Sequence, residues 1–184
     1  MCTDKGEKKT IVLDASSLIL LGKCGLVELL SQTFRIIIPK GVLNETVNEV
    51  TLKQHPEANV ISELVQGEKI EVFPIVKEKF KFPVTLGRGE IEAIILTSKM
   101  GNAILITDDG KAIKACRYLK IPFTISPKMV VELYRLERID FKNAKASIDK
   151  LRIIGRYSPE IIAEALIRLK EVKDVKADNR PGSR

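Results

Sequence analysis

Apolar and polar positions alternate along the chain in a pattern that predicts strands and helices in turn. Short, almost continuous apolar runs predict buried strands at residues 10–14, 34–39, 69–76, 102–107 and 121–126. Between them, apolar residues recur every three or four positions, which predicts helices at 16–31, 41–50, 55–67, 87–101 and 109–120. Pro74 lacks an N–H group, so the strand before it is expected at a sheet edge. This alternation favours a three-layer α/β/α sandwich around a mostly parallel sheet.

The pattern changes near residue 126, after which only helical periodicity remains. Further helices are predicted at 126–139, 141–155 and 158–172, and the end of the chain, "KADNRPGSR", is polar. We therefore expect a first domain at 1–137, a C-terminal helical extension packed on it at 138–172, and a disordered basic tail at 173–184.

Composition fits a folded, globular protein of the cytoplasm. The 184 residues are 45% hydrophobic and 30% charged, and no apolar run approaches the roughly 20 residues of a membrane span. The start, "MCTDKGEKKT", has no apolar segment typical of a secretory signal. Cys2, Cys24 and Cys116 show no CxxC spacing, which argues against a disulfide framework or a zinc site. Cys24 and Cys116 are expected as small core residues.

Positive charge gathers toward the C-terminus. The net charge is +7, and residues 142–184 hold 11 Lys and Arg against 6 Asp and Glu, a net of +5. This bias is compatible with a polyanionic partner such as RNA, although Lys-rich solvated helices are also common. Aromatic residues make up only 5% of the chain, which argues against base stacking as the main binding mode. The one histidine, His55, is expected as a loop or cap residue.

Acidic residues follow two of the predicted strands. Asp14 ends the first strand, and Asp108 and Asp109 end the fourth. In an open parallel sheet, ligands bind beyond the carboxyl ends of the strands, so these positions open at the same edge. Glu90 lies in the first turn of the helix that follows "GRG", and Glu45 lies in the helix after the second strand. Both helices are expected to start at that edge.

Each acid also has a purely structural interpretation. Asp14 would cap the helix that begins near Ser16, and the Asp108–Asp109 pair with its glycine suits a turn. Glu90 suits a helix N-terminus, and Glu45 would be an exposed helical residue, with Glu49 one turn further along the same face.

Taken together, however, clustered carboxylates repel one another and need a cation. Mg²⁺ and Mn²⁺ prefer oxygen ligands and are the natural candidates. Ser16 and Thr107, each two residues from a candidate aspartate, are expected to orient a ligand carboxylate or to bind water near the metal. Arg88, between two glycines, is a candidate contact for a nucleic-acid phosphate, and a plain exposed arginine is the alternative.

The segments "IVLDASSLI", "GRGEIEAIIL" and "ILITDDGKAIKA", in this order, resemble the PIN domain, a nuclease fold found in many prokaryotic toxins of toxin–antitoxin pairs. The "GRGE" form is similar to a prokaryotic subgroup of PIN-like proteins. The resemblance spans residues 10–137, and the subgroup's further helices extend it to 172.

The resemblance implies a Mg²⁺- or Mn²⁺-dependent ribonuclease that cleaves phosphodiester bonds in RNA. Asp14, with its hydroxyl neighbour Ser16, matches the acid that closes the first strand, and Glu45 matches the acid of the helix after the second. Glu90 stands where the family most often has Asp, and Asp109 matches the acid two places after Thr107. The implied catalytic residues are Asp14, Glu45, Glu90 and Asp109. Asp14, Glu90 and Asp109 are also expected as metal ligands, together with Asp108, an additional acid that many members of the family lack.

A toxin role is one version of this function, with an antitoxin protein and a second copy of the chain as expected partners. The main alternative is a catalytically inactive PIN-like module that binds RNA or a protein. Nucleotide-binding enzymes of other classes fit less well. The chain has no G-x-x-x-x-G-K-[ST] segment, and "GRGEIEA" lacks the third glycine of a dinucleotide-binding loop.

Overall fold

A computed structural model describes residues 8–74 and 81–178; residues 1–7, 75–80 and 179–184 lie outside this description. The chain forms two compact units, Met1–Thr124 and Ile125–Arg184. The boundary therefore falls before the helix at Ser126 and not at the expected position of 137/138. That helix groups with the two helices that follow it in the sequence.

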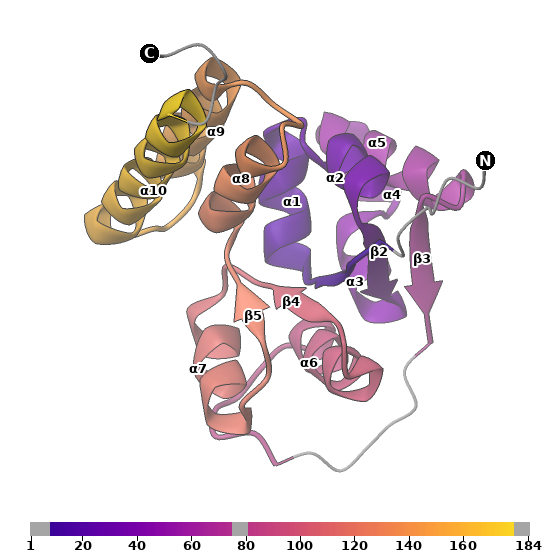
Figure 1. The fold of residues 1–184 in the computed structure, drawn as a ribbon. Helices are drawn as coiled ribbons and strands as arrows, with labels where there is room; N and C mark the ends of the chain where they lie inside the picture. Colours follow the sequence, from indigo (N-terminus) through magenta and orange to yellow (C-terminus); the bar gives the residue numbers. More distant parts are fainter. Residues whose placement is uncertain (1–7, 75–80, 179–184) are drawn as a thin grey trace, which may run out of the picture. The chain divides into compact units, whose positions relative to one another are not determined.

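A five-stranded parallel sheet forms the centre of the first unit (Figure 1). Its order is β3-β2-β1-β4-β5, and Ile11 in β1 pairs with Ile36 on one side and Ile104 on the other. The third strand lies at an edge, as Pro74 predicts. The strands are β1 (Thr10–Leu13), β2 (Arg35–Pro39), β3 (Ile70–Phe73), β4 (Ile104–Ile106) and β5 (Phe123–Thr124).

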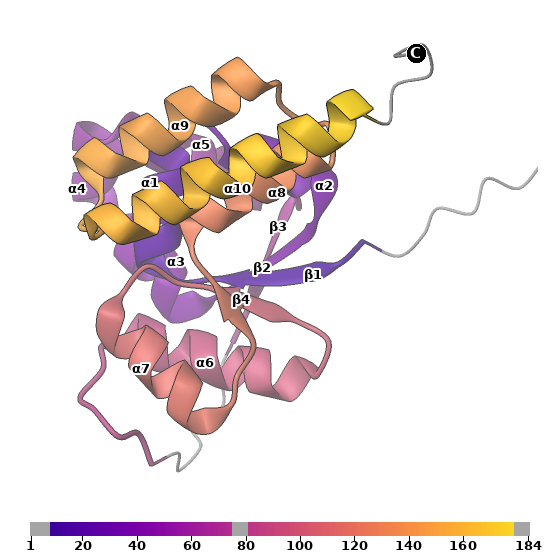
Figure 2. The same ribbon diagram turned by 60° about the vertical axis from the view of Figure 1, so that its left-hand side comes forward.

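Helices cover both faces of this sheet. Figures 1 and 2 show α6 and α7 on one face and α1 and α5 on the other, which confirms the expected three-layer α/β/α arrangement. Val12, Ile37 and Leu105, in three adjacent strands, are fully buried. The helices are α1 (Ala15–Lys23), α2 (Val27–Thr33), α3 (Lys40–Thr46), α4 (Glu49–Gln54), α5 (Pro56–Gln66), α6 (Arg88–Met100) and α7 (Gly110–Leu119).

Two of the predicted helices are broken. The expected helix at 16–31 divides at Gly25, whose φ of +70° is a conformation that other residues rarely adopt. The expected helix at 41–50 ends at Thr46, and α4 begins after Asn48. The Asn48 side chain accepts hydrogen bonds from the N–H groups of Val50 and Thr51, both at 3.1 Å, and so caps a new helix.

The second unit consists of α8 (Ser126–Arg135), α9 (Phe141–Ile154) and α10 (Pro159–Asp178), which pack on one another. Tyr134 and Phe141 meet edge to face with centroids 5.9 Å apart. Helix α10 continues six residues beyond the predicted end at 172, so residues 173–178 are helical and not a disordered tail. Lys176 helps to hold this last part, because its Nζ donates to the Tyr134 carbonyl at 2.8 Å.

No single helix among the described residues is long and apolar enough to cross a membrane. Helices α1 and α2 reach that length and composition only as a pair, and this pair is bent by 109°. Of the cysteines in the described ranges, Cys116 is buried, as expected, whereas Cys24 is partly exposed. Cys2 lies outside the described residues.

Candidate functional site

The carboxyl edge of the sheet collects the starts of several helices. Helices α1, α3 and α7 each begin within four residues of the end of a strand, and Asp14 and Asp109 are the N-caps of α1 and α7. Both aspartates therefore do what their structural interpretation predicts. Capping is not the only role open to them, because Glu45 of α3 and Glu90 in the first turn of α6 lie at the same edge.

Asp14 is a buried carboxylate held from both sides. The residue is only 1% exposed. Its Oδ1 accepts hydrogen bonds from the Ser16 hydroxyl and the Ser17 N–H, both at 2.8 Å. Oδ2 accepts a short hydrogen bond from the Thr107 hydroxyl. Burial nevertheless raises the pKa of Asp14 above its ordinary value, although these hydrogen bonds act in the opposite direction.

The segment 107–109 is tied to Asp14 through two hydroxyl groups. The Ser16 hydroxyl accepts from the Asp108 N–H at 3.1 Å, and the Thr107 hydroxyl accepts from the Asp109 N–H at 3.3 Å. Each of these hydroxyls in turn donates to the Asp14 carboxylate. Ser16 and Thr107 therefore orient the Asp14 carboxylate, in line with one of the two roles expected of them.

The pKa of Glu90 reflects the charges of the other acids at this edge. Burial raises its pKa, the Gly87 N–H lowers it through a 2.5 Å hydrogen bond, and the negative charges of Asp109, Asp14 and Glu45 raise it further. Asp109, Asp14 and Glu45, distant in sequence, thus lie close enough to Glu90 to disfavour its charged form.

Glu45 and the alternative Glu49 have different surroundings. Oε1 of Glu45 accepts from the Gly89 N–H at 3.0 Å, which places this carboxylate at the start of α6 and next to Glu90. Both glutamates are exposed, but Glu49 opens α4, beyond the break at Val47. The structure therefore brings Glu45 to the carboxylate group and places Glu49 on a separate helix.

The donor chemistry of this edge suits a hard divalent cation, because every acid offers carboxylate oxygens. Across residues 8–74 and 81–178, however, no three Asp, Glu, His or Cys side chains are arranged as a ligand group. In the described structure Glu45, Glu90 and Asp109 each accept their hydrogen bonds through one oxygen, which leaves the second one as a potential ligand. The site thus fits a divalent cation in charge and in donor type.

Arg88 stands at the first position of α6, with a side chain that is 77% exposed. Its Nε donates to Oε1 of Glu92 at 2.7 Å. The N–H groups of Gly87 and Gly89 beside it are already used by Glu90 and Glu45. An anion at this position would therefore meet the guanidinium group and not these two backbone donors.

Two residues of this region, Ser17 and Glu92, were not predicted from the sequence. Ser17 is fully buried, and its hydroxyl lies 2.8 Å from Oδ1 of Asp14 and 2.7 Å from the Ile106 carbonyl. Glu92 is 8% exposed, and its Oε2 accepts from the Gly41 N–H at 2.7 Å. An acid on the apolar side of a helix was the available signal for Glu92.

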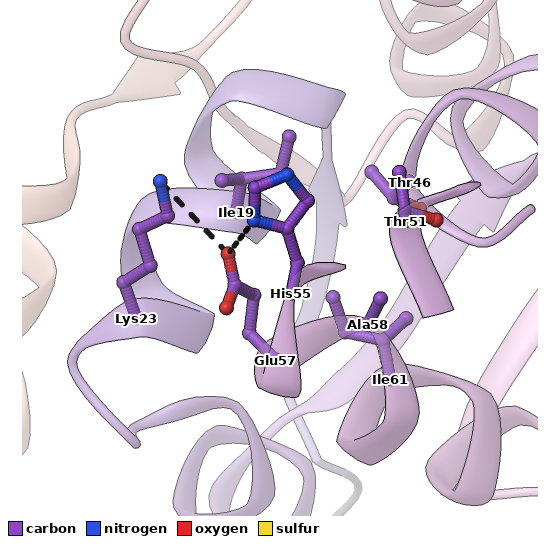
Figure 3. Close-up of a pocket in the computed structure, with 8 residues that line it drawn as sticks. All are labelled: Ile19, Lys23, Thr46, Thr51, His55, Glu57, Ala58 and Ile61. Carbon is purple, nitrogen blue, oxygen red and sulfur yellow. Dashed lines mark ion pairs between the residues drawn. The ribbon is translucent and has the colours of Figure 1, made fainter. Parts of the chain in front are cut away.

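A separate pocket of about 180 Å³ lies between α1, α4 and α5 (Figure 3). Figure 3 shows Lys23 and His55 pointing toward Glu57, whose side chain is only 9% exposed. Oε1 of Glu57 is 3.8 Å from His55 Nδ1 and 3.9 Å from Lys23 Nζ. No predicted site residue is among those that line this pocket, so His55 remains outside the carboxylate site.

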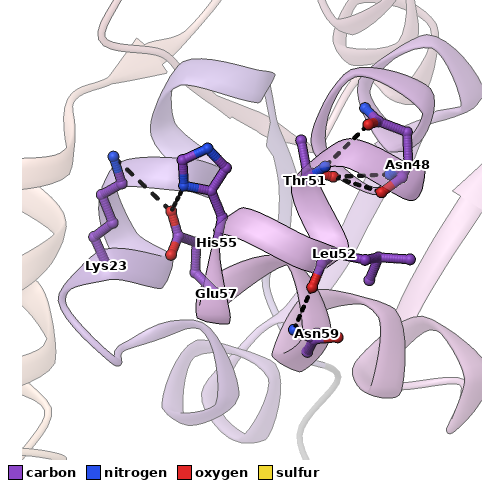
Figure 4. Close-up of polar contacts among 7 residues, drawn as sticks. All are labelled: Lys23, Asn48, Thr51, Leu52, His55, Glu57 and Asn59. Atoms are coloured by element: carbon purple, nitrogen blue, oxygen red, sulfur yellow. Dashed lines mark hydrogen bonds and ion pairs between the residues drawn. The ribbon is translucent and has the colours of Figure 1, made fainter.

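The polar contacts around this pocket are structural. His55 joins α4 to α5 as a cap residue, which confirms its expected position. Figure 4 shows the Asn48–Thr51 capping contacts and the Asn59 side chain, which donates to the Leu52 carbonyl at 3.1 Å. These bonds fix the turn between two short helices.

Cys116 of α7 is fully buried in a core cluster that includes Val12 and Leu105 of the sheet. Burial raises the pKa of its thiol to about 12, and the negative charge of Asp14 adds to this effect. A thiol of this kind is a core residue and not a nucleophile.

Comparisons with known proteins agree with this architecture. A family model described as PIN domain matches residues 10–171, most of the chain. A comparison with proteins of curated function returns no match.

Similar solved structures come from archaea and from a named endonuclease. A PilT N-terminus domain protein of the hyperthermophilic archaeon Sulfolobus solfataricus P2 is 17% identical, with 65% of this chain and 89% of that chain covered and a TM-score of 0.45. The PIN domain endonuclease Utp24 is 13% identical, with coverages of 65% and 86% and a TM-score of 0.46. A domain of a functionally unknown Methanocaldococcus jannaschii protein is 20% identical, with coverages of 64% and 90% and a TM-score of 0.44. Similarities at this level carry no argument about activity.

Proposed function

The chain belongs to the PIN domain family, and on that premise we propose that it is a metal-dependent endoribonuclease that hydrolyses phosphodiester bonds in RNA. The observation that carries the proposal is the geometry of the acids at one sheet edge. Asp14 and Asp109 follow two adjacent strands and cap the helices that begin there. Glu45 accepts from the Gly89 N–H, next to Glu90. Mutual repulsion among carboxylates is destabilising unless they are protonated or neutralised by a cation. A divalent cation is the neutraliser that also serves phosphodiester cleavage.

Asp14, Glu90, Asp108 and Asp109 would hold Mg²⁺ or Mn²⁺, with Glu45 completing the acidic set. When bound, such an ion makes a water molecule more acidic and offsets the charge of the phosphate. The chain's own hydroxyls orient the carboxylates: Ser16 and Thr107 fix both oxygens of Asp14 and, through backbone N–H groups, the turn at 108–109. Arg88, exposed at the start of α6, would bind a phosphate of the substrate.

The biological setting proposed for this activity is a toxin–antitoxin pair in the cytoplasm, with an antitoxin segment covering the acidic edge and a second copy of the chain as partner. A protein that covers the carboxylates would block both metal and substrate.

A catalytically inactive module that binds RNA or a protein is the second candidate. It is favoured by one observation: within the described ranges no three acidic, histidine or cysteine side chains form a ready ligand group. A binding module has no need of divalent ions at this edge, whereas the nuclease does.

The experiment compares cleavage of end-labelled single-stranded RNA, structured RNA and single-stranded DNA by the wild type and Asp14→Asn. The nuclease proposal expects RNA cleavage that requires added Mn²⁺ or Mg²⁺, stops with chelator and is lost in Asp14→Asn. RNA binding without cleavage under every metal condition would overturn it in favour of the binding module.

A further inference from the structure

Two helices at the candidate site cap one another reciprocally. Glu45 of α3 accepts from the N–H of Gly89, the second residue of α6, at 3.0 Å. Glu92 of α6 accepts from the N–H of Gly41, the second residue of α3, at 2.7 Å. Each helix therefore satisfies a free N-terminal N–H of the other with a glutamate from its own first two turns.

Both N–H groups belong to glycines, and neither position has room for a Cβ atom beside the carboxylate that it contacts. A Cβ atom on Gly41 would lie 2.5 Å from Oε2 of Glu92, and one on Gly89 would lie 2.7 Å from Oε1 of Glu45. These distances are far below ordinary contact, so any side chain would push a carboxylate away. The two glycines thus allow the close approach of the two helix starts.

We propose that Glu92 is a positioning residue for the metal site. This inference rests on the proposed function, and Glu92 is not among the acids that the family resemblance implies. The contacts of Glu92 are with Gly41 and Arg88. It holds the start of α3 against α6 through Gly41, and α3 carries Glu45. Because Gly89 and Glu90 are neighbours in α6, the same bond network fixes Glu45 relative to Glu90.

Because Glu92 contacts Arg88 as well as Gly41, a substitution can remove one contact and keep the other. Oε1 of Glu92 pairs with Arg88, whose side chain is 77% exposed and free to turn into solvent. A glutamine at position 92 can still accept from Gly41 with its amide oxygen while Arg88 moves away. An alanine leaves the buried Gly41 N–H without its acceptor. Glu92→Gln therefore keeps the link to α3, and Glu92→Ala removes it.

The experiment measures the Mn²⁺ dissociation constant of the full chain by calorimetry, with folding checked by circular dichroism. Glu92→Ala is expected to weaken binding about 10- to 100-fold, the usual effect of losing an outer partner of a metal ligand. Gly41→Ala, which displaces the Glu92 carboxylate without removing it, is expected to weaken binding in the same direction. Glu92→Gln is expected to bind nearly as the wild type does.

Gly110→Ala is the matched control, because a Cβ atom there meets nothing within 4 Å. Wild-type affinity in folded Glu92→Ala or folded Gly41→Ala, with binding lost in Asp14→Asn, would overturn the positioning role and leave the metal site intact. Absence of Mn²⁺ binding in the wild type would overturn the proposed function and this inference with it.

Discussion

The hydroxyl of Thr107 donates a hydrogen bond to Oδ2 of Asp14, a residue 93 positions away in the sequence. The two residues lie at the ends of adjacent parallel strands, β1 and β4. The same hydroxyl accepts from the Asp109 N–H at 3.3 Å. One side chain therefore holds together the two segments that supply three of the candidate acids, and it does so with no exposure to solvent.

Thr107→Val tests this link, because valine has nearly the same shape and lacks the hydroxyl. Loss of a hydrogen bond to a charged group costs about 1.5–3 kcal/mol, and we expect a loss of that size in the free energy of unfolding. Thr97→Val is the matched control, since Thr97 is also buried but its hydroxyl donates to the Ala93 carbonyl of its own helix. Urea unfolding that gives equal losses for the two variants would contradict the special role of Thr107.

The buried charge of Asp14 predicts a pH-dependent effect in the metal-free protein. The folded-state pKa lies above the ordinary value of 3.8, so the folded chain holds this proton more tightly than the unfolded chain. The resulting stabilisation is present below that value and is lost as the pH rises through the folded-state pKa. Asp14→Asn, which carries no charge, should therefore gain stability relative to the wild type over this rise in pH.

Thermal unfolding with chelator, followed from acidic to neutral pH, measures that difference. Added Mn²⁺ should then raise the melting temperature of the wild type and not of Asp14→Asn. A stability difference that stays constant with pH would argue against a buried carboxylate that titrates in this range.

Glu45 and Glu49 make a matched pair of glutamates on successive short helices. We expect Glu45→Gln to lower RNA cleavage at limiting Mn²⁺ by about tenfold or more, because this carboxylate is coupled to Glu90. Glu49→Gln should behave as the wild type, since Glu49 lies on the separate helix α4, beyond the end of α3. Initial rates over a Mn²⁺ titration decide the matter, and an equal decline in both variants would remove Glu45 from the site.

The two described cysteines are expected to differ in reactivity. Burial and the charge of Asp14 hold the Cys116 pKa near 12, so its thiolate is scarce at neutral pH. Cys24 is partly exposed. Iodoacetamide at pH 8 should therefore label Cys24 in the folded protein and Cys116 only after denaturation, as read by peptide mass spectrometry. Rapid labelling of Cys116 in the folded protein would contradict this prediction, because it would show that the core around Cys116 is accessible to the reagent.

The sequence was sufficient to place the acids because strand ends and helix starts follow from periodicity. Asp14 and Asp109 lie where buried apolar runs end, and a parallel sheet brings such positions to one edge. The choice of Glu45 over Glu49 was beyond periodicity, since the break between α3 and α4 depends on capping by Asn48. Glu92 was missed because its partner Gly41 is 51 residues away on another helix, a contact with no local signature.

Calorimetric titration of Mn²⁺ into the wild type, Asp14→Asn and Asp109→Asn tests the central claim most directly. Asparagine at position 109 can still cap α7, so loss of binding would report the missing charge and not a damaged helix. Asp140→Asn is the control, because Asp140 caps α9 in the same manner, outside the acidic set. We predict saturable binding to the wild type and the control, and its loss in both site variants. No binding to the wild type at millimolar Mn²⁺, or unchanged binding in both site variants, would contradict a metal-dependent nuclease at this edge.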